Sequence, residues 1–258
     1  RSRRAARASP TFARVRYQAL VAARHPRAPA VAAALALVAL AAGVGLLARG
    51  REPGFARELE QRLVAGDVDG ARRALRDAER ERPGDPLVEK LRGDVACARR
   101  AYGDCLRRYD AALAAAPRFA TDARIRENAL ALAARGDDRR AVVAVLAKLD
   151  RIDPALAALT GGERYWPRWN AVRALEARGR ADQVDYARVY ALDLVHAGSC
   201  DTRRAAANKL ARLRDRRVLP ELERALAAAR GSFWEWRCTG PEVEDALRAT
   251  RAAAVAVR

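Results

Sequence analysis

The chain has 258 residues, of which 50 are lysine or arginine and 32 are aspartate or glutamate, so its formal net charge is +18. Alanine is abundant and aromatic residues make up only 5% of the chain, which favours an all-α fold over a β-rich one. Most basic residues are interspersed with acidic ones, so the charge lacks the stripe typical of nucleic-acid binding, and no specific nucleic-acid partner is predicted. The chain has no methionine and begins at Arg1, so we expect it to be the C-terminal part of a longer protein.

The first 48 residues fall into two segments. Residues 1–27 contain eight arginines and no acidic residue, which is typical of a basic, disordered linker beside a membrane. Residues 28–48 carry no charge, and about 20 apolar residues are enough to span a bilayer. The segment therefore predicts one transmembrane helix that contacts the lipid bilayer. A buried helix of a soluble domain and a cleaved signal peptide are the alternatives.

Two segments after residue 52 match each other at an offset of 34 residues. Small residues align with small, large with large and proline with proline, at Ala71 and Cys105, Leu75 and Tyr109, Ala78 and Ala112, and Pro83 and Pro117. A 34-residue period of paired helices resembles the tetratricopeptide repeat. The resemblance covers residues 52–154 and includes a degenerate third unit at about 119–154. An alanine-rich array of other helical hairpins is the alternative.

Residues 155–258 are predicted to form a second helical region. Its segment LTGGERYWPRWN (159–170) gathers three aromatic residues, which either plug the joint between two helical arrays or bind a peptide or sugar. Residues 201–229 show a pattern of arginine, alanine, leucine, a turn aspartate and Leu-Pro that resembles a HEAT repeat. The predicted fold class is therefore all-α, with one transmembrane helix followed by an α-α hairpin solenoid that is first tetratricopeptide-like and then HEAT-like.

The four cysteines suggest disulfides if this region lies outside the cytoplasm. Of the three connectivities we favour Cys97–Cys105, across one hairpin turn, together with Cys200–Cys238. Four small buried thiols are the alternative. His196, Cys200 and Cys238 offer three metal ligands, but no C-x-x-C pair accompanies them. We therefore predict no metal and no cofactor.

No catalytic motif is present in the sequence. The phosphate loop, G-x-G-x-x-G and H-E-x-x-H are absent, and so are the glycine loop, H-R-D and D-F-G of protein kinases. We therefore predict that this chain is not an enzyme.

The order of basic linker, membrane helix and repeats resembles the C-terminal half of transmembrane serine/threonine protein kinases from GC-rich bacteria. The resemblance implies a kinase domain before Arg1, although no catalytic residue is carried over. It also implies a single-pass protein of the bacterial inner membrane, with the N-terminus in the cytoplasm and the C-terminal domain in the periplasm as a sensory or scaffolding tail. A stand-alone cell-envelope scaffold is the alternative.

The function predicted from the sequence is binding of a protein or peptide on the concave face of the solenoid. Arginines with one aromatic neighbour would favour acidic side chains or a C-terminal carboxylate. The residues expected to form this site are Arg72, Arg99, Tyr102, Arg107 and Arg126. A homodimer that passes a signal through the single membrane helix is also compatible with this layout.

Overall fold

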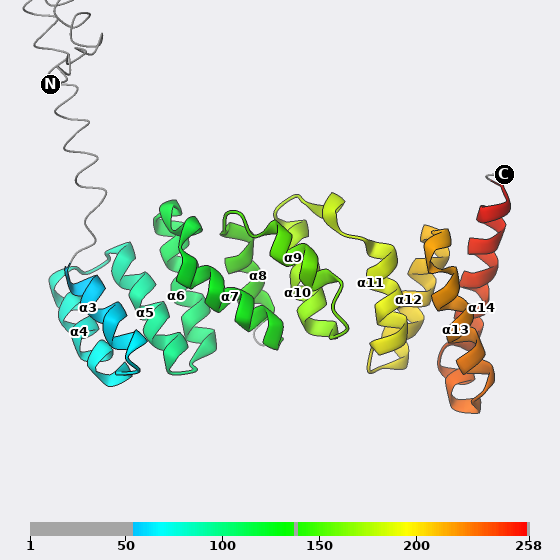
Figure 1. The fold of residues 1–258 in the computed structure, drawn as a ribbon, viewed down its shortest axis with the longest axis horizontal. Coiled ribbons are helices and arrows are strands. Elements are labelled where there is room, and N and C mark those ends of the chain that lie inside the picture. The colour runs from blue at the N-terminus through cyan, green and yellow to red at the C-terminus, as the bar shows by residue number, and fades with distance from the viewer. Residues whose placement is uncertain (1–53, 137–138, 257–258) are drawn as a thin grey trace, which may run out of the picture. The chain divides into compact units, whose positions relative to one another are not determined.

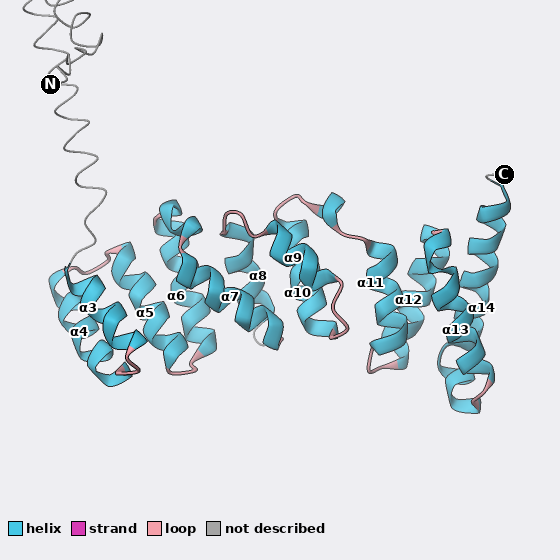
Figure 2. Ribbon diagram, in the orientation of Figure 1, coloured by secondary structure: helices cyan, strands magenta, loops and turns pink. Residues whose placement is uncertain are grey.

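The structure is a computed structural model that describes residues 54–136 and 139–256. Within these ranges the regular secondary structure is helical, with 12 α-helices and three short 3-10 helices (Figures 1 and 2). Contacts divide the chain into a unit of residues 1–57 and a unit of residues 58–258, and the packing reported below is that of the second unit. The segments 1–27 and 28–48 lie outside the described residues.

The predicted fold class is wrong in its membrane element. In the described part of the chain, no helix is both long and apolar enough to cross a membrane. The longest, α14 (Phe233–Ala256), has 24 residues but carries charged side chains through most of its length. The segment on which the transmembrane prediction rested is not among the described residues. We therefore drop the membrane helix, the bilayer as a partner and the single-pass inner-membrane location, and keep the all-α part.

The first part of the array consists of eight helices that follow one another along the chain. They are α3 (Gly54–Val64), α4 (Val68–Glu81), α5 (Pro86–Ala98), α6 (Tyr102–Ala115), α7 (Ala123–Arg135), α8 (Arg139–Lys148), α9 (Asp153–Thr160) and α10 (Tyr165–Ala177). Aspartates open several of them. For example, the Asp85 side chain accepts a hydrogen bond from the backbone N–H of Leu87 at the start of α5, which satisfies a donor that has no partner within the helix.

The 34-residue offset of the sequence reappears in the helices. Helices α4 and α6 have 14 residues each and start at Val68 and Tyr102, which are 34 residues apart. The aligned small and large residues are all buried, at Ala71, Leu75 and Ala78 in α4 and at Cys105, Tyr109 and Ala112 in α6. Small residues let neighbouring helices approach closely and the larger ones fill the remaining space.

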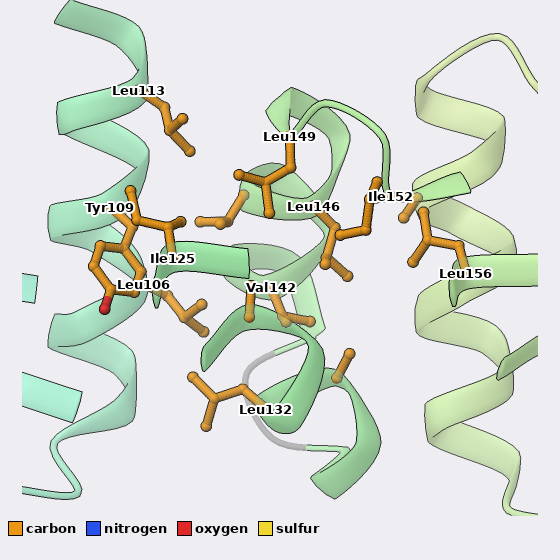
Figure 3. Packing of buried hydrophobic residues seen from close by; sticks show 14 of the residues in the cluster. Leu106, Tyr109, Leu113, Ile125, Leu132, Val142, Leu146, Leu149, Ile152 and Leu156 are labelled. Atoms are coloured by element: carbon orange, nitrogen blue, oxygen red, sulfur yellow. The ribbon is translucent and has the colours of Figure 1, made fainter. Parts of the chain in front are cut away.

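The first hydrophobic cluster extends over α5 to α11 and is shown in part in Figure 3. Leu106, Tyr109 and Leu113 of α6 face Ile125 of α7 and Val142 of α8. On the other side of α8, Leu146 and Leu149 lie toward Ile152 and Leu156 at the start of α9. The cluster is continuous across several hairpins, so each hairpin buries apolar surface that it could not bury alone.

The second hydrophobic cluster is formed by the last four helices. These are α11 (Tyr186–His196), α12 (Cys200–Leu213), α13 (Leu219–Arg230) and α14. Its buried residues include Leu194, Leu210, Leu222 and Val243. Helix α12 packs against both α11 and α14, and α13 packs against α14.

Aromatic residues fill the joint between α10 and α11. Trp169 packs against the first cluster and Tyr190 against the second, and their ring centroids are 6.0 Å apart. Tyr165 lies 6.2 Å from Trp169 on the other side. All three rings are half-buried. This packing favours the plug over the ligand-binding patch as the role of the aromatic segment.

Candidate functional site: a groove between α11 and α13

The five residues predicted to bind a ligand are distributed over several helices: Arg72 lies on α4, Arg99 directly after α5, Tyr102 and Arg107 on α6, and Arg126 on α7. Arg107 pairs with Asp104 at 3.2 Å, and the Tyr102 ring centroid lies 4.7 Å from the guanidinium carbon of Arg135. No hydrogen bond, ion pair or ring contact in the described ranges joins any two of the five. The structure does not gather them into one site.

A different set of charged residues does come together in this region, around Lys90 of α5. The Lys90 Nζ lies 2.9 Å from Glu60 Oε1, 3.0 Å from Asp94 Oδ2 and 3.5 Å from Asp122 Oδ2. Lys90 is only 3% exposed. Sequence reasoning missed this cluster, although a lysine and an aspartate four residues apart within a helix with an apolar face are a signal that could have indicated it.

Hydrogen bonds complete this Lys90 cluster. Tyr109 donates its hydroxyl to Asp94 Oδ1 at 2.6 Å, and the Asn128 side-chain amide donates to the Tyr109 oxygen at 2.7 Å. Burial alone would lower the pKa of Lys90, but the carboxylates of Asp94 and Asp122 outweigh burial and raise that pKa. Lys90 is therefore a charged, fully paired group. Such a cluster links α3, α5, α6 and α7, and it leaves little for a ligand to bind.

A groove of about 470 Å³ lies between α11 and α13. Helix α11 contributes neighbouring residues that recur every four positions, at 187–188, 191–192 and 195–196, so one face of three turns points into it. The opposite wall is the 3-10 helix η3 (Arg216–Val218) and the first turns of α13. We call this site the arginine groove, and its lining residues are Asp185, Ala187, Arg188, Ala191, Leu192, Val195, His196, Arg217, Val218, Glu221 and Arg224.

The arginine groove combines apolar and charged side chains. Ala187, Ala191 and Val218 are buried, whereas Val195 is exposed. The small alanines leave the space, and the valines supply apolar surface that a ligand could cover. The lining also contains three arginines and two carboxylates, so its formal charge is positive.

The three arginines of the groove differ in their engagement. Arg217 is held by Asp185 Oδ2 at 2.9 Å and Asp215 Oδ2 at 2.6 Å, and these hydrogen bonds raise its pKa. Arg224 donates to Glu221 Oε1 at 3.0 Å. The Arg188 side chain makes no hydrogen bond or ion pair within the ranges that the structure describes. Arg217 therefore closes one end of the groove, and Arg188 is available to a ligand.

Glu221 adds an acceptor to the same wall. Its Oε2 atom is buried and has no hydrogen-bond partner, whereas Oε1 accepts from Arg224. Buried polar atoms are nearly always paired in native proteins. A donor on a bound molecule would satisfy this oxygen, which makes Glu221 a second candidate contact beside Arg188.

A buried ion pair fixes α11, and with it one wall of the groove. Arg168 of α10 is 0% exposed, and its Nη2 lies 2.5 Å from Asp193 Oδ1 of α11. Trp169 Nε1 donates to the other oxygen of Asp193 at 2.9 Å. Arg168 also donates to the backbone oxygens of Gly162 and Glu163. Burial raises the pKa of Asp193, and the bonds from Arg168 and Trp169 oppose that rise. The pair positions α11 from its inner side, away from the ligand.

The cysteines form two disulfides in the pairing that the sequence favoured. Cys97 is bonded to Cys105 and Cys200 to Cys238, each with a Cα–Cα distance of 5.1 Å. The second bond joins the start of α12 to α14, so both thiols that accompanied His196 in the three-ligand set are in a disulfide. In the two described stretches, no group of three or more His, Cys, Asp or Glu is placed to hold a metal ion.

Comparisons with protein-family models, with curated proteins and with solved structures find no match to this chain. The assignment of function below therefore depends on the groove itself.

Proposed function

We propose that this chain is a non-catalytic helical-repeat module that binds a segment of another protein in the arginine groove. The observation that carries the proposal is the combination of an apolar floor, a free arginine and an unsatisfied acceptor between two parallel walls. A space between two helices with small residues at its floor suits a third helix, which is a common mode of peptide recognition. The positive lining favours a segment with acidic side chains.

The geometry suggests how an amphipathic helix would bind. Its apolar face would cover Leu192, Val195 and Val218, and a carboxylate on its edge would pair with Arg188. Carboxylate–arginine pairs combine charge with two directed hydrogen bonds, so they give orientation as well as affinity. A stand-alone scaffold that organises a complex would use the same groove. That a kinase domain precedes Arg1 stays a prediction, which the upstream reading frame tests.

Fluorescence anisotropy with a labelled peptide tests the proposal. The probe is an amphipathic helix of about 14 residues, four turns long, with leucines on one face and glutamates beside them. A control peptide carries lysine in place of each glutamate. We expect the acidic peptide to bind the wild-type chain and the basic peptide to bind at least about tenfold more weakly, which corresponds to about 1.4 kcal/mol.

Two double variants with equal charge change locate the binding. Arg188→Glu with Arg224→Glu reverses the groove, and we expect a loss of affinity of about tenfold or more. Arg99→Glu with Arg107→Glu reverses two arginines of the site predicted from the sequence and should leave affinity nearly unchanged. Equal losses in both variants would indicate a general charge effect. A loss only in the second would move the site to α5 and α6.

A further inference from the structure

Two aromatic side chains are unusually exposed at the turn between α13 and α14. Phe233 is 67% exposed and Trp234 is 75% exposed, and their rings meet edge to face at 5.7 Å. Trp236, two residues later, instead packs partly into the second cluster, across Gly240, where a side-chain carbon would come within 2.5 Å of the indole. Large aromatic residues that face solvent together are rare on monomers and mark interaction sites. We call Phe233 and Trp234 the aromatic tip.

The aromatic tip is held rigidly in place. The disulfide of Cys238 to Cys200 lies one turn after Trp234 and ties α14 to α12. Arg203 of α12 binds both carboxylate oxygens of Glu235. Arg204 donates to the backbone oxygens of Cys238 at 2.7 Å and Arg237 at 3.0 Å. A side chain that is already fixed loses less entropy on binding, so this clamp suits an anchor residue.

A pocket with complementary chemistry lies elsewhere on the same chain. It has a volume of about 480 Å³, and its apolar side chains are Val184, Tyr186 and Leu213. Its acidic side chains are Asp182, Asp185 and Asp215. Leu213 is largely exposed, and the Asp182 side chain has no hydrogen-bond or ion-pair partner in the described stretches. Beside the tip, Arg237 lies 5.7 Å from the Phe233 ring and likewise has no acidic partner there. We call this site the acidic pocket.

The tip and the pocket lie at opposite ends of the last four helices. The pocket is formed where α11 begins, where α12 ends and just before α13 begins. The tip follows the other end of α13, which has 12 residues. A helix of that length is about 18 Å long, and Figure 1 shows the α13–α14 turn at the edge away from the start of α11. One copy therefore cannot place its own tip in its own pocket.

We propose that a second copy of this chain fills the acidic pocket with its aromatic tip. In this contact Phe233 and Trp234 of one copy cover the apolar side chains of the pocket, and Arg237 faces Asp182 of the other copy. Each copy has one tip and one pocket on different surfaces, so the contact is head-to-tail and can continue through further copies. Each aromatic ring buries about 150–250 Å². The interface is therefore small and its assembly is expected to depend on concentration.

Sedimentation velocity of the full chain tests this contact. We expect the wild-type average mass to rise with concentration up to about 0.1 mM, a range suited to a weak, small interface. Trp234→Ala should abolish the rise. Val255→Ala is the matched control, since Val255 is 74% exposed on the same helix and lies outside the contact, so it should associate like the wild type. A wild-type chain that stays monomeric over this range would overturn the proposal.

Paired charge reversals distinguish this contact from other modes of association. Arg237→Glu faces Asp182 with a like charge, and Asp182→Arg faces Arg237 with a like charge, so each variant alone should not associate. When the two variants are mixed, every tip meets a pocket of opposite charge, and association should return. Failure of the mixture to associate would contradict the contact. The peptide experiment on the arginine groove is independent, because neither Arg237 nor Asp182 lines that groove.

Discussion

The two hydrophobic clusters treat charge in opposite ways. In the first, Lys90 is buried among Glu60, Asp94 and Asp122, and each charge has its partner in the protein. In the second, Arg188 lies at the edge of an open groove without a partner in the described residues, and Glu221 keeps an unsatisfied oxygen. The comparison teaches that the number of charged residues does not locate a binding site. What matters is whether the protein itself has already paired them.

The largest expected effect separates a paired charge from a free one. Lys90→Met should destabilise the chain by about 3–5 kcal/mol, because it leaves Asp94 buried without its counter-charge. Arg188→Met should change stability by no more than about 0.5 kcal/mol. Guanidinium denaturation measures both, provided that the slopes agree. Similar small changes in the two variants would remove the distinction between the clusters.

A second comparison uses the two disulfides, since one lies in each cluster. Cys200 and Cys238 are 38 residues apart, whereas Cys97 and Cys105 are 8 residues apart. Loop entropy in the unfolded chain gives about 4 kcal/mol for the longer loop and about 2.5 kcal/mol for the shorter. Replacing each pair by serine should therefore destabilise the chain more at Cys200–Cys238. The reverse order in denaturation midpoints would show that local packing outweighs loop length.

The smallest effect concerns Asp153, which is partly exposed within the first cluster. Burial alone would raise its pKa, but hydrogen bonds from Arg178 and Arg180 outweigh burial and lower that pKa below the usual 3.8. The folded chain then binds this proton less tightly than the unfolded chain. Its contribution is complete above about pH 5 and is lost as the pH falls toward about 2. Thermal unfolding of Asp153→Asn should show a weaker loss of stability over that range than the wild type, and identical profiles would exclude this role.

Much of the helical array could be predicted from local patterns. The 34-residue offset gave helices α4 and α6 their matching lengths and buried positions, and the hairpin turn explained why Cys97 and Cys105 lie close together. The Lys90 cluster was missed because a lysine in a helix is typical of a solvated face. It becomes a buried residue only through Glu60 and Asp122, each about 30 residues away in the chain.

The arginine groove could not be predicted for the same reason. Its walls come from Ala187–His196 and Arg217–Arg224, and nothing in either segment shows that they pack side by side. Arginines 72, 99, 107 and 126 were chosen from a repeat pattern, which describes packing but does not show which cations lack partners. The difference between a free and a paired arginine depends on tertiary contacts, so only the structure distinguishes them.

Hydrogen exchange with and without the acidic amphipathic peptide tests the central claim most directly. We expect the bound peptide to slow exchange in residues 187–196 and 217–224, the two walls of the arginine groove. Exchange in α5 to α7, which carry the Lys90 cluster and most of the sequence-predicted arginines, should not change. Protection confined to α5–α7 would contradict the assignment and return the site to the arginines predicted from the sequence.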